Sequence, residues 1–168
     1  TGPSGVGKDA VFSGMRELRN SYYFVTTTTT RAQRPDEIDG LDYNFLSEPA
    51  FRKKIAQNEF LEWAKVYGNL YGVPKNEVSG AMKSGRDVIL KTDVQGVGNL
   101  KTLAPEGVFI FIAPPSLEDL SHRLVKRMTE TPGTLEIRLQ TAREELKQAD
   151  QYEHVVINYN NQLGNTIR

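Results

Sequence analysis

The first nine residues hold the clearest chemical motif in the chain. Gly2, Gly7 and Lys8 fit the G-x-x-x-x-G-K pattern of phosphate-binding loops. Glycines permit the backbone angles that turn consecutive N–H groups toward an anion, and Lys8 brings a point charge to the β- and γ-phosphates of a nucleotide. The residues expected to bind these phosphates are Gly2, Pro3, Ser4, Gly5, Val6, Gly7, Lys8 and Asp9.

The residue after Lys8 departs from the usual pattern, which has Ser or Thr there as a magnesium ligand. This chain has Asp9. A carboxylate suits Mg²⁺ as a hard oxygen ligand, but it also places negative charge beside the nucleotide phosphates. Three roles for Asp9 stay open, namely direct metal ligation, ligation through water, and interaction with the positive end of the following helix.

The segment after the loop has the spacing of an amphipathic helix, because Val11, Met15 and Leu18 fall on one face. A helix directly after the loop is the context that a phosphate-binding loop requires. A glycine-rich turn before an ordinary helix is the simpler alternative. The sequence begins inside the motif, so we expect that the strand preceding such a loop is missing from it.

Composition argues against several classes of protein. The 168 residues carry 21 Lys and Arg against 21 Asp and Glu, so the net charge is zero. This overall charge gives no indication of a surface that binds nucleic acid or a membrane. The absence of cysteine excludes disulfides and thiolate metal sites, and it is compatible with a reducing cytoplasm. No apolar run approaches the roughly 20 residues of a membrane helix. The length favours one domain with a substantial core.

Strand-like segments alternate with helical patterns along most of the chain. Residues 22–26, 88–90, 108–112 and 155–157 have the aromatic and β-branched composition of strands. The segment 108–112 is apolar throughout, which predicts a central strand buried on both faces. This alternation predicts an α/β fold, with helices on both faces of a parallel sheet.

One region interrupts that alternation. Residues 60–67 and 70–73 have strand patterns, and Gly68–Asn69 between them predicts a tight hairpin turn. This antiparallel pair is the best candidate for a small inserted subdomain. Shortly before it, Arg31 and Arg34 stand three residues apart in a polar loop, either as a solvated pair or as an anion-binding pair.

A series of short motifs, taken in order, resembles guanylate kinase from Gly2 to about Asn158. The motifs are Thr29-Thr30-Arg31-Ala32-Gln33-Arg34, Gly40-Leu41-Asp42-Tyr43, Glu62-Trp63-Ala64, Gly68-Asn69-Leu70-Tyr71-Gly72, Asp93-Val94-Gln95-Gly96 and Pro114-Pro115-Ser116. The resemblance implies one domain over 1–168, with a core at 1–26 and 74–168, a lid at about 123–142, and a GMP-binding subdomain at about 27–73.

The resemblance also implies a set of residues for GMP. Guanine offers two neighbouring donors, N1–H and the N2 amine, and the Glu62 carboxylate would accept from both, whereas adenine offers an acceptor at N1. Arg31 and Arg34 would hold the phosphate through forked guanidinium donors. The full expected set of GMP-binding residues is Thr27, Arg31, Arg34, Tyr43, Glu62, Tyr71 and Asp93.

The implied reaction is ATP-dependent phosphorylation of GMP to GDP, with Mg²⁺ accompanying ATP. No general base is needed, because the attacking phosphate oxygen is already largely ionised at pH 7. The expected partners are the substrates ATP and GMP, without nucleic acid or membrane, and the expected location is cytoplasmic. The expected catalytic residues are Lys8, Arg123, Arg127 and Arg138.

Two alternative functions stay open. Asp9 and Val73, which stands where the family usually has Ser or Thr, leave room for a nucleoside monophosphate kinase with another base preference. A non-catalytic guanylate-kinase-like module that binds a peptide is the other reading. Such a module would be expected to lose the phosphate loop or its lysine, yet Lys8 is present here.

Overall fold

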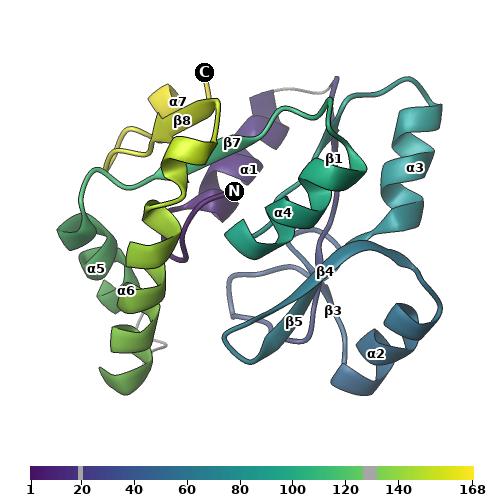
Figure 1. Cartoon of the computed structure of the whole chain (residues 1–168), viewed down its shortest axis with the longest axis horizontal. Helices are drawn as coiled ribbons and strands as arrows, with labels where there is room; N and C mark the ends of the chain where they lie inside the picture. The colour runs from purple at the N-terminus through teal and green to yellow at the C-terminus, as the bar shows by residue number, and fades with distance from the viewer. Residues whose placement is uncertain (19–20, 127–131) are drawn as a thin grey trace. The chain divides into compact units, whose positions relative to one another are not determined.

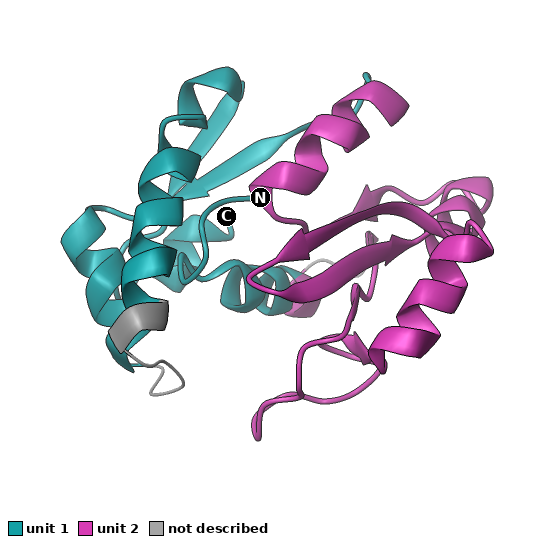
Figure 2. Ribbon diagram, turned by 60° about the horizontal axis from the view of Figure 1, so that its bottom comes forward, with its two compact units in different colours: residues 1–15, 104–168 teal, residues 16–103 magenta. Residues whose placement is uncertain are grey.

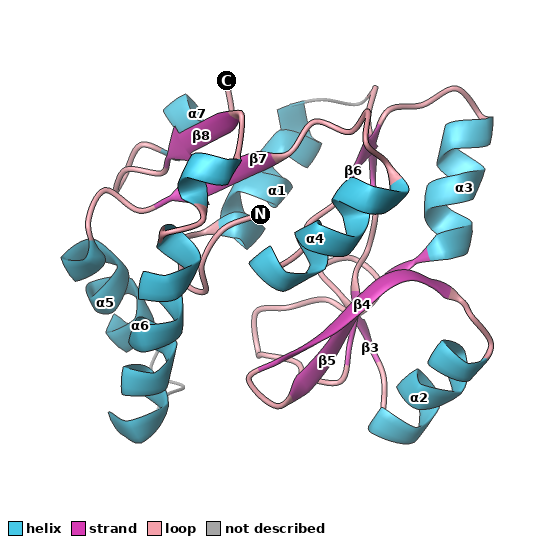
Figure 3. Cartoon of the chain, in the orientation of Figure 1, coloured by secondary structure: helices cyan, strands magenta, loops and turns pink. Residues whose placement is uncertain are grey.

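The structure is a computed structural model that describes residues 1–18, 21–126 and 132–168. The chain divides into two compact units, one of residues 1–15 and 104–168 and the other of residues 16–103 (Figure 2). Helices and strands alternate along it, and two of the strand pairings are parallel pairs of the kind that the sequence predicts (Figure 3). The predicted boundaries of core, lid and GMP-binding subdomain stay predictions.

The first unit carries the phosphate-loop motif and a parallel pair of strands. Strands β7 and β8 run side by side, with Ile110 opposite His154 and Ala113 opposite Ile157. Its elements are most of α1 (Lys8–Leu18), β7 (Ile110–Ala113), α5 (Leu117–Lys126), α6 (Pro132–Leu146), a 3₁₀ turn (Ala149–Gln151), β8 (His154–Ile157) and α7 (Leu163–Thr166) (Figure 1).

The core of the first unit also anchors the loop. Val6 is fully buried, together with Leu120, Leu124 and Ala142, and Ile112, Leu135 and Leu139 pack against this cluster. Because Val6 lies within the glycine-rich motif, burial of its side chain fixes the middle of the loop to α5 and α6.

Strand β7 is less buried than its composition predicts. The expectation of a strand at 108–112 buried on both faces is wrong, because the side chains of Val108 and Ile110 are 72% and 43% exposed. The strand begins only at Ile110, and within it Phe111 and Ala113 are the buried residues. Apolar composition does not by itself reveal which faces receive covering elements.

The second unit contains a four-stranded mixed sheet and a separate parallel pair. The sheet has the order β3-β2-β5-β4, in which β2 and β3 are parallel and the other pairs antiparallel, while β1 pairs with β6. Its elements are β1 (Tyr23–Phe24), β2 (Thr28–Thr29), β3 (Asn44–Phe45), α2 (Glu48–Ala56), β4 (Phe60–Val66), β5 (Asn69–Pro74), α3 (Lys75–Lys83), β6 (Val88–Ile89) and α4 (Val94–Leu103).

The hairpin between β4 and β5 forms one residue earlier than predicted. Val66 pairs with Asn69, so the turn residues are Tyr67 and Gly68 rather than Gly68 and Asn69. Both turn residues have positive φ, 48° at Tyr67 and 83° at Gly68. This is the backbone of a type I′ turn, whose twist matches that of the two strands.

Several helix ends follow the sequence signals, whereas some packing details do not. Ser47 accepts the Ala50 N–H at the start of α2, and Ser116 Oγ accepts the Asp119 N–H at the start of α5 while its hydroxyl donates to Asp119 Oδ2. Leu18, expected on the buried face of α1, is 59% exposed. Helix α6 ends at Leu146, and a separate 3₁₀ turn follows at Ala149–Gln151.

No helix in the described ranges is both long enough and apolar enough to cross a membrane.

Candidate active site

The glycine-rich loop adopts the backbone that its sequence predicts. Gly2, Gly5 and Gly7 all have positive φ, at 147°, 85° and 100°. A Cβ on Gly5 would lie 2.6 Å from Leu124 Cδ2, so the loop also needs glycine for space. The Lys8 ammonium donates to the carbonyls of Gly2 (2.5 Å) and Pro3 (3.1 Å), which folds the lysine back along its own loop.

Asp9 lies inside the first turn of α1, which begins at Lys8, and its side chain is half-buried. It therefore follows the loop lysine directly and does not occupy the position before the helix. At this point the positive end of the helix favours a carboxylate. A hard oxygen donor in this place also fits Mg²⁺, which in proteins is commonly held by one or two carboxylates together with substrate phosphates and water.

Arg123 is fixed against the same loop. Its guanidinium donates to the backbone carbonyls of Val6 (2.9 Å) and Asn158 (2.6 Å) and to the side chain of Asn160 (2.9 Å). Arg138 lies half-buried on α6. Arg127, the third arginine expected to act in catalysis, lies outside the described residues.

Arg31 and Arg34 are joined by a carboxylate that the sequence motifs do not single out. Glu37 Oε1 lies 2.7 Å from Arg31 Nη2 and 3.2 Å from Arg34 Nη1, and Glu37 Oε2 accepts the Arg34 backbone N–H at 2.8 Å. Burial opposes ionisation of Glu37, but these partners outweigh it and lower its pKa. The two guanidiniums are therefore held in a fixed relation to each other rather than as a loosely solvated pair.

Aromatic rings complete this cationic cluster. The Arg31 guanidinium carbon lies 5.4 Å from the centroid of Tyr43, whose ring packs edge-on against Tyr71 at 6.2 Å. Burial would lower the pKa of Arg31, but hydrogen bonds and charges from Glu37 and Tyr71 raise it. Four of the expected GMP-binding residues, two arginines and two tyrosines, are thus brought together.

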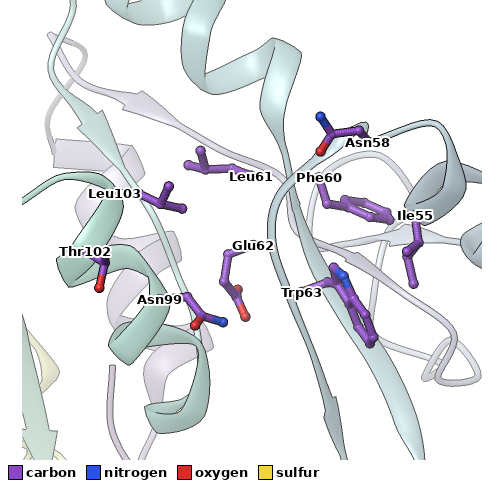
Figure 4. Close-up of a pocket in the computed structure, with 9 residues that line it drawn as sticks. All are labelled: Ile55, Asn58, Phe60, Leu61, Glu62, Trp63, Asn99, Thr102 and Leu103. Atoms are coloured by element: carbon purple, nitrogen blue, oxygen red, sulfur yellow. The ribbon is translucent and has the colours of Figure 1, made fainter.

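Glu62 is a buried carboxylate beside a cavity. Only 5% of the residue is exposed, and its Oε1 has no hydrogen-bond partner among the described residues. The cavity has a volume of about 410 Å³. Figure 4 shows Glu62 in its wall, with the side chain of Asn99 on α4 directed toward the carboxylate. An acceptor oxygen without a partner, on the edge of a cavity, is the arrangement expected of a ligand contact.

The environment of Glu62 raises its pKa from 4.5 to about 7. Burial is the largest cause, the negative charge of Asp93 is the second, and a hydrogen bond from Thr92 opposes them. Space for the carboxylate depends on Gly96, where a Cβ would lie 2.7 Å from Glu62 Oε1. The glycine of the Asp93-Val94-Gln95-Gly96 motif therefore has a packing role next to the expected base reader.

The remaining base-side residues are tied to nearby backbone. The buried Thr27 hydroxyl donates to the Lys91 carbonyl at 3.1 Å. One Asp93 oxygen accepts the Gly96 N–H at 3.0 Å, at the start of α4. Val73 is buried in an apolar cluster with Val25 and Val78, so this departure from the family pattern has become a core position.

The pKa of Glu62 predicts how stability depends on pH. The folded value of about 7 exceeds the ordinary value of 4.5. Between these values the folded chain holds a proton that the unfolded chain has lost, so the free energy of unfolding should fall as pH rises, by up to about 3 kcal/mol. Replacement by Gln removes the titrating group and should flatten this part of the profile.

Urea unfolding of wild type and Glu62→Gln at pH 5, 6, 7 and 8 would measure the effect as the difference between the two curves. Glu106→Gln, at an exposed position, is the matched control and should follow wild type. Parallel profiles for wild type and Glu62→Gln would contradict the raised pKa.

Comparison with known proteins gives the family. The sequence model described as guanylate kinase matches residues 1–168. The chain belongs to the guanylate kinase family. A guanylate kinase of Clostridium perfringens is 42% identical over 95% of this chain and 74% of its own length, and that of Gloeobacter violaceus is 46% identical over 94% and 77%.

A solved structure confirms the fold. The crystal structure of guanylate kinase from Anaplasma phagocytophilum matches with a TM-score of 0.79 and 29% identity, and the match covers 95% of this chain and 76% of that one. The predicted α/β fold and the family resemblance are therefore both confirmed. The roles of individual residues stay predictions.

Three residues near the expected site were missed by the sequence motifs. Glu37 holds the two arginines, Thr92 hydrogen bonds to Glu62, and Lys91 lies between the base-side and phosphate-side residues. A glutamate three residues after an arginine is common on protein surfaces, and a lysine shortly after a strand is equally common. No local pattern distinguishes them, because their partners lie in other segments of the chain.

Proposed function

We propose that this chain transfers the γ-phosphoryl group of ATP to GMP, giving ADP and GDP. The observation that carries the proposal is the buried Glu62 carboxylate with an unpartnered oxygen in the wall of a cavity, in a chain of the guanylate kinase family. The loop in one unit supplies the ATP-binding residues, and the residues for GMP all belong to the other.

Base recognition follows from the acceptor character of Glu62. When ionised, its carboxylate can accept from both N1–H and the N2 amine of guanine, and a good bidentate contact with a base is worth about 1–3 kcal/mol of discrimination. Binding two donors favours the charged form of the carboxylate. Guanine therefore offsets the burial and the Asp93 charge that raise the pKa of Glu62 in the free chain.

Phosphate recognition uses charge and fixed geometry. Arg31 and Arg34, held by Glu37, would present forked donors to the oxygens of the GMP phosphate, and the hydroxyl groups of the neighbouring Tyr43 and Tyr71 would donate to the same phosphate. In the other unit, Lys8 belongs to the loop that would bind the ATP phosphates, and Arg123 on α5 donates to the Val6 carbonyl of that loop. The reaction needs positioning and charge neutralisation rather than a general base.

Mg²⁺ belongs to the proposal as the ion that accompanies ATP, with Asp9 as the residue of the loop that would hold it directly or through water. When bound, it neutralises charge on the phosphate oxygens. Asp9, for its part, places a carboxylate where the family pattern has a hydroxyl, and a bound cation would offset its repulsion of the ATP phosphates.

Asp9→Asn tests this role. We expect the preference of the chain for Mg²⁺·ATP over metal-free ATP to fall about tenfold, because a residue that supports a bound metal typically contributes at least that much to its affinity. Calorimetric titration of ATP with and without Mg²⁺ measures the preference. Glu17→Gln, exposed near the end of the same helix, is the control. Superimposable Mg²⁺ dependences of wild type and Asp9→Asn would reject the metal role.

The whole activity is tested by ADP release from ATP as a function of added nucleotide. We expect release that depends on GMP, with AMP, CMP and UMP poor substrates. Equal turnover of AMP and GMP would replace the proposal by a kinase of another base preference. Release with none of the four monophosphates would replace it by a non-catalytic binding module.

The rest of the proposal concerns the binding partners of the chain and its location in the cell. ATP and GMP are the expected small-molecule partners, and the balanced charge of the chain gives no reason to add nucleic acid or a membrane. A cytoplasmic location fits a sequence without cysteine and substrates that belong to the purine nucleotide pool.

A further inference from the structure

Lys91 is a buried cation that neither the phosphate loop nor the expected GMP set uses. It stands two residues after β6, at the carboxyl end of that strand, which is where ligands bind in open parallel sheets. Only 8% of the residue is exposed. A charged lysine is rarely so buried without a specific environment for its ammonium group.

That environment includes the ring of Tyr43, which belongs to the cationic cluster around Arg31 and Arg34. The Lys91 ammonium lies 3.9 Å from the centroid of Tyr43, the ring over which the Arg31 guanidinium also lies. It donates to the Asp42 carbonyl at 3.5 Å. The backbone of Lys91 is fixed from the base side, since its carbonyl accepts the Thr27 hydroxyl. Lys91 thus connects the two groups of residues expected to hold one nucleotide.

The charge of the cluster supports a role for this cation. Arg31, Arg34 and Glu37 together carry one net positive charge, whereas a nucleotide phosphate carries about −1.5 to −2 at pH 7. The Lys91 ammonium would bring the cluster to two. The neighbouring carboxylates of Asp39 and Asp42 accept the backbone N–H groups of Phe45 and Ile38 and keep their negative charge, so the count of two applies to the side chains grouped around Glu37 and Tyr43 and not to the whole loop.

We propose that Lys91 is a further substrate-binding residue, whose ammonium on the Tyr43 ring contacts the phosphate of the acceptor nucleotide as a third cation beside Arg31 and Arg34. The proposal rests on the proposed function, because it assumes that GMP is the acceptor. A purely structural lysine, which only tied the Asp42 carbonyl to the end of β6, would affect GMP and guanosine equally.

Lys91→Gln separates these roles, because the amide can still donate to the Asp42 carbonyl but carries no charge. Calorimetric titrations with GMP and with guanosine, which lacks the phosphate, give the two affinities. We expect GMP affinity to fall at least about tenfold, as for loss of a charged hydrogen bond, while guanosine affinity changes less than about twofold. Lys91→Arg should restore most of the GMP affinity, and exposed Lys83→Met should match wild type.

Equal losses for GMP and guanosine, or no loss for either, would overturn the role of Lys91 and leave the proposed function intact. If wild type itself bound GMP no better than guanosine, the result would instead contradict the proposal that Arg31 and Arg34 bind the GMP phosphate. Should Lys91→Gln not fold, the assigned side-chain NMR signal of Lys91 in wild type decides. It should shift on titration with GMP and not with guanosine, and the absence of such a difference would overturn the proposal.

Discussion

Replacing Lys8 by Met should reduce kcat by at least about a hundredfold while leaving GMP affinity within about twofold of wild type. Loss of a single preorganised charged donor at a reacting group typically costs 10²–10³ in rate. Lys8 belongs to the glycine-rich loop of one unit, and the residues expected to bind GMP all belong to the other. The substitution should therefore affect the phosphate donor site without altering the acceptor site.

Two measurements check this result. Steady-state kinetics at saturating ATP and GMP give kcat, and calorimetric titration of GMP gives the affinity of the second site. Lys147→Met, an exposed lysine on the same unit, should behave as wild type. A large loss of GMP affinity in Lys8→Met would mean that the two nucleotides are not bound by the separate residue sets described above.

Replacing Glu62 by Gln should weaken the preference for guanine. The Gln side chain is nearly isosteric, but it offers one acceptor and one donor where the carboxylate offers two acceptors, so one guanine donor meets a donor. We expect kcat/KM for GMP to fall roughly 5–150-fold, which corresponds to a loss of about 1–3 kcal/mol of transition-state stabilisation. The value for AMP should change little, so the ratio between the two substrates should collapse.

Competition between GMP and AMP at a series of ratios measures this discrimination directly. The exposed Glu106→Gln variant serves again as the control. A retained preference for GMP would show that guanine is read by other groups, such as Asp93 or backbone. Guanosine binding to wild type provides an independent check, because it should weaken below pH 7 as Glu62 gains its proton.

Features that depend only on neighbouring residues along the chain could be predicted from the sequence. Gly2, Gly7 and Lys8 define the phosphate loop because its backbone angles and its lysine are set within eight residues, and the positive φ values of the glycines agree with this. The caps at Ser47 and Ser116 are equally local. The order of motifs was sufficient for the family, which the comparisons confirm.

Features that depend on distant segments could be identified only in the folded chain. The pKa of Glu62 is set by burial and by Asp93, 31 positions along the chain, and no periodicity in β4 distinguishes this residue from an exposed strand residue. The apolar segment around β7 turned out to be partly exposed, and the hairpin turn moved by one residue. Packing and strand register depend on contacts with residues far away in the sequence, and a local pattern does not identify those residues.

For the same reason, the role of Lys8 could be predicted from the sequence and the role of Lys91 could not. Lys8 is recognisable from its own loop, whereas the environment of Lys91 consists of Tyr43, Asp42 and Thr27, which are brought to the end of β6 only by folding. A buried ammonium against an aromatic ring is a property of the assembled chain, since the residues that contact Lys91 come from segments about 50 to 65 positions away.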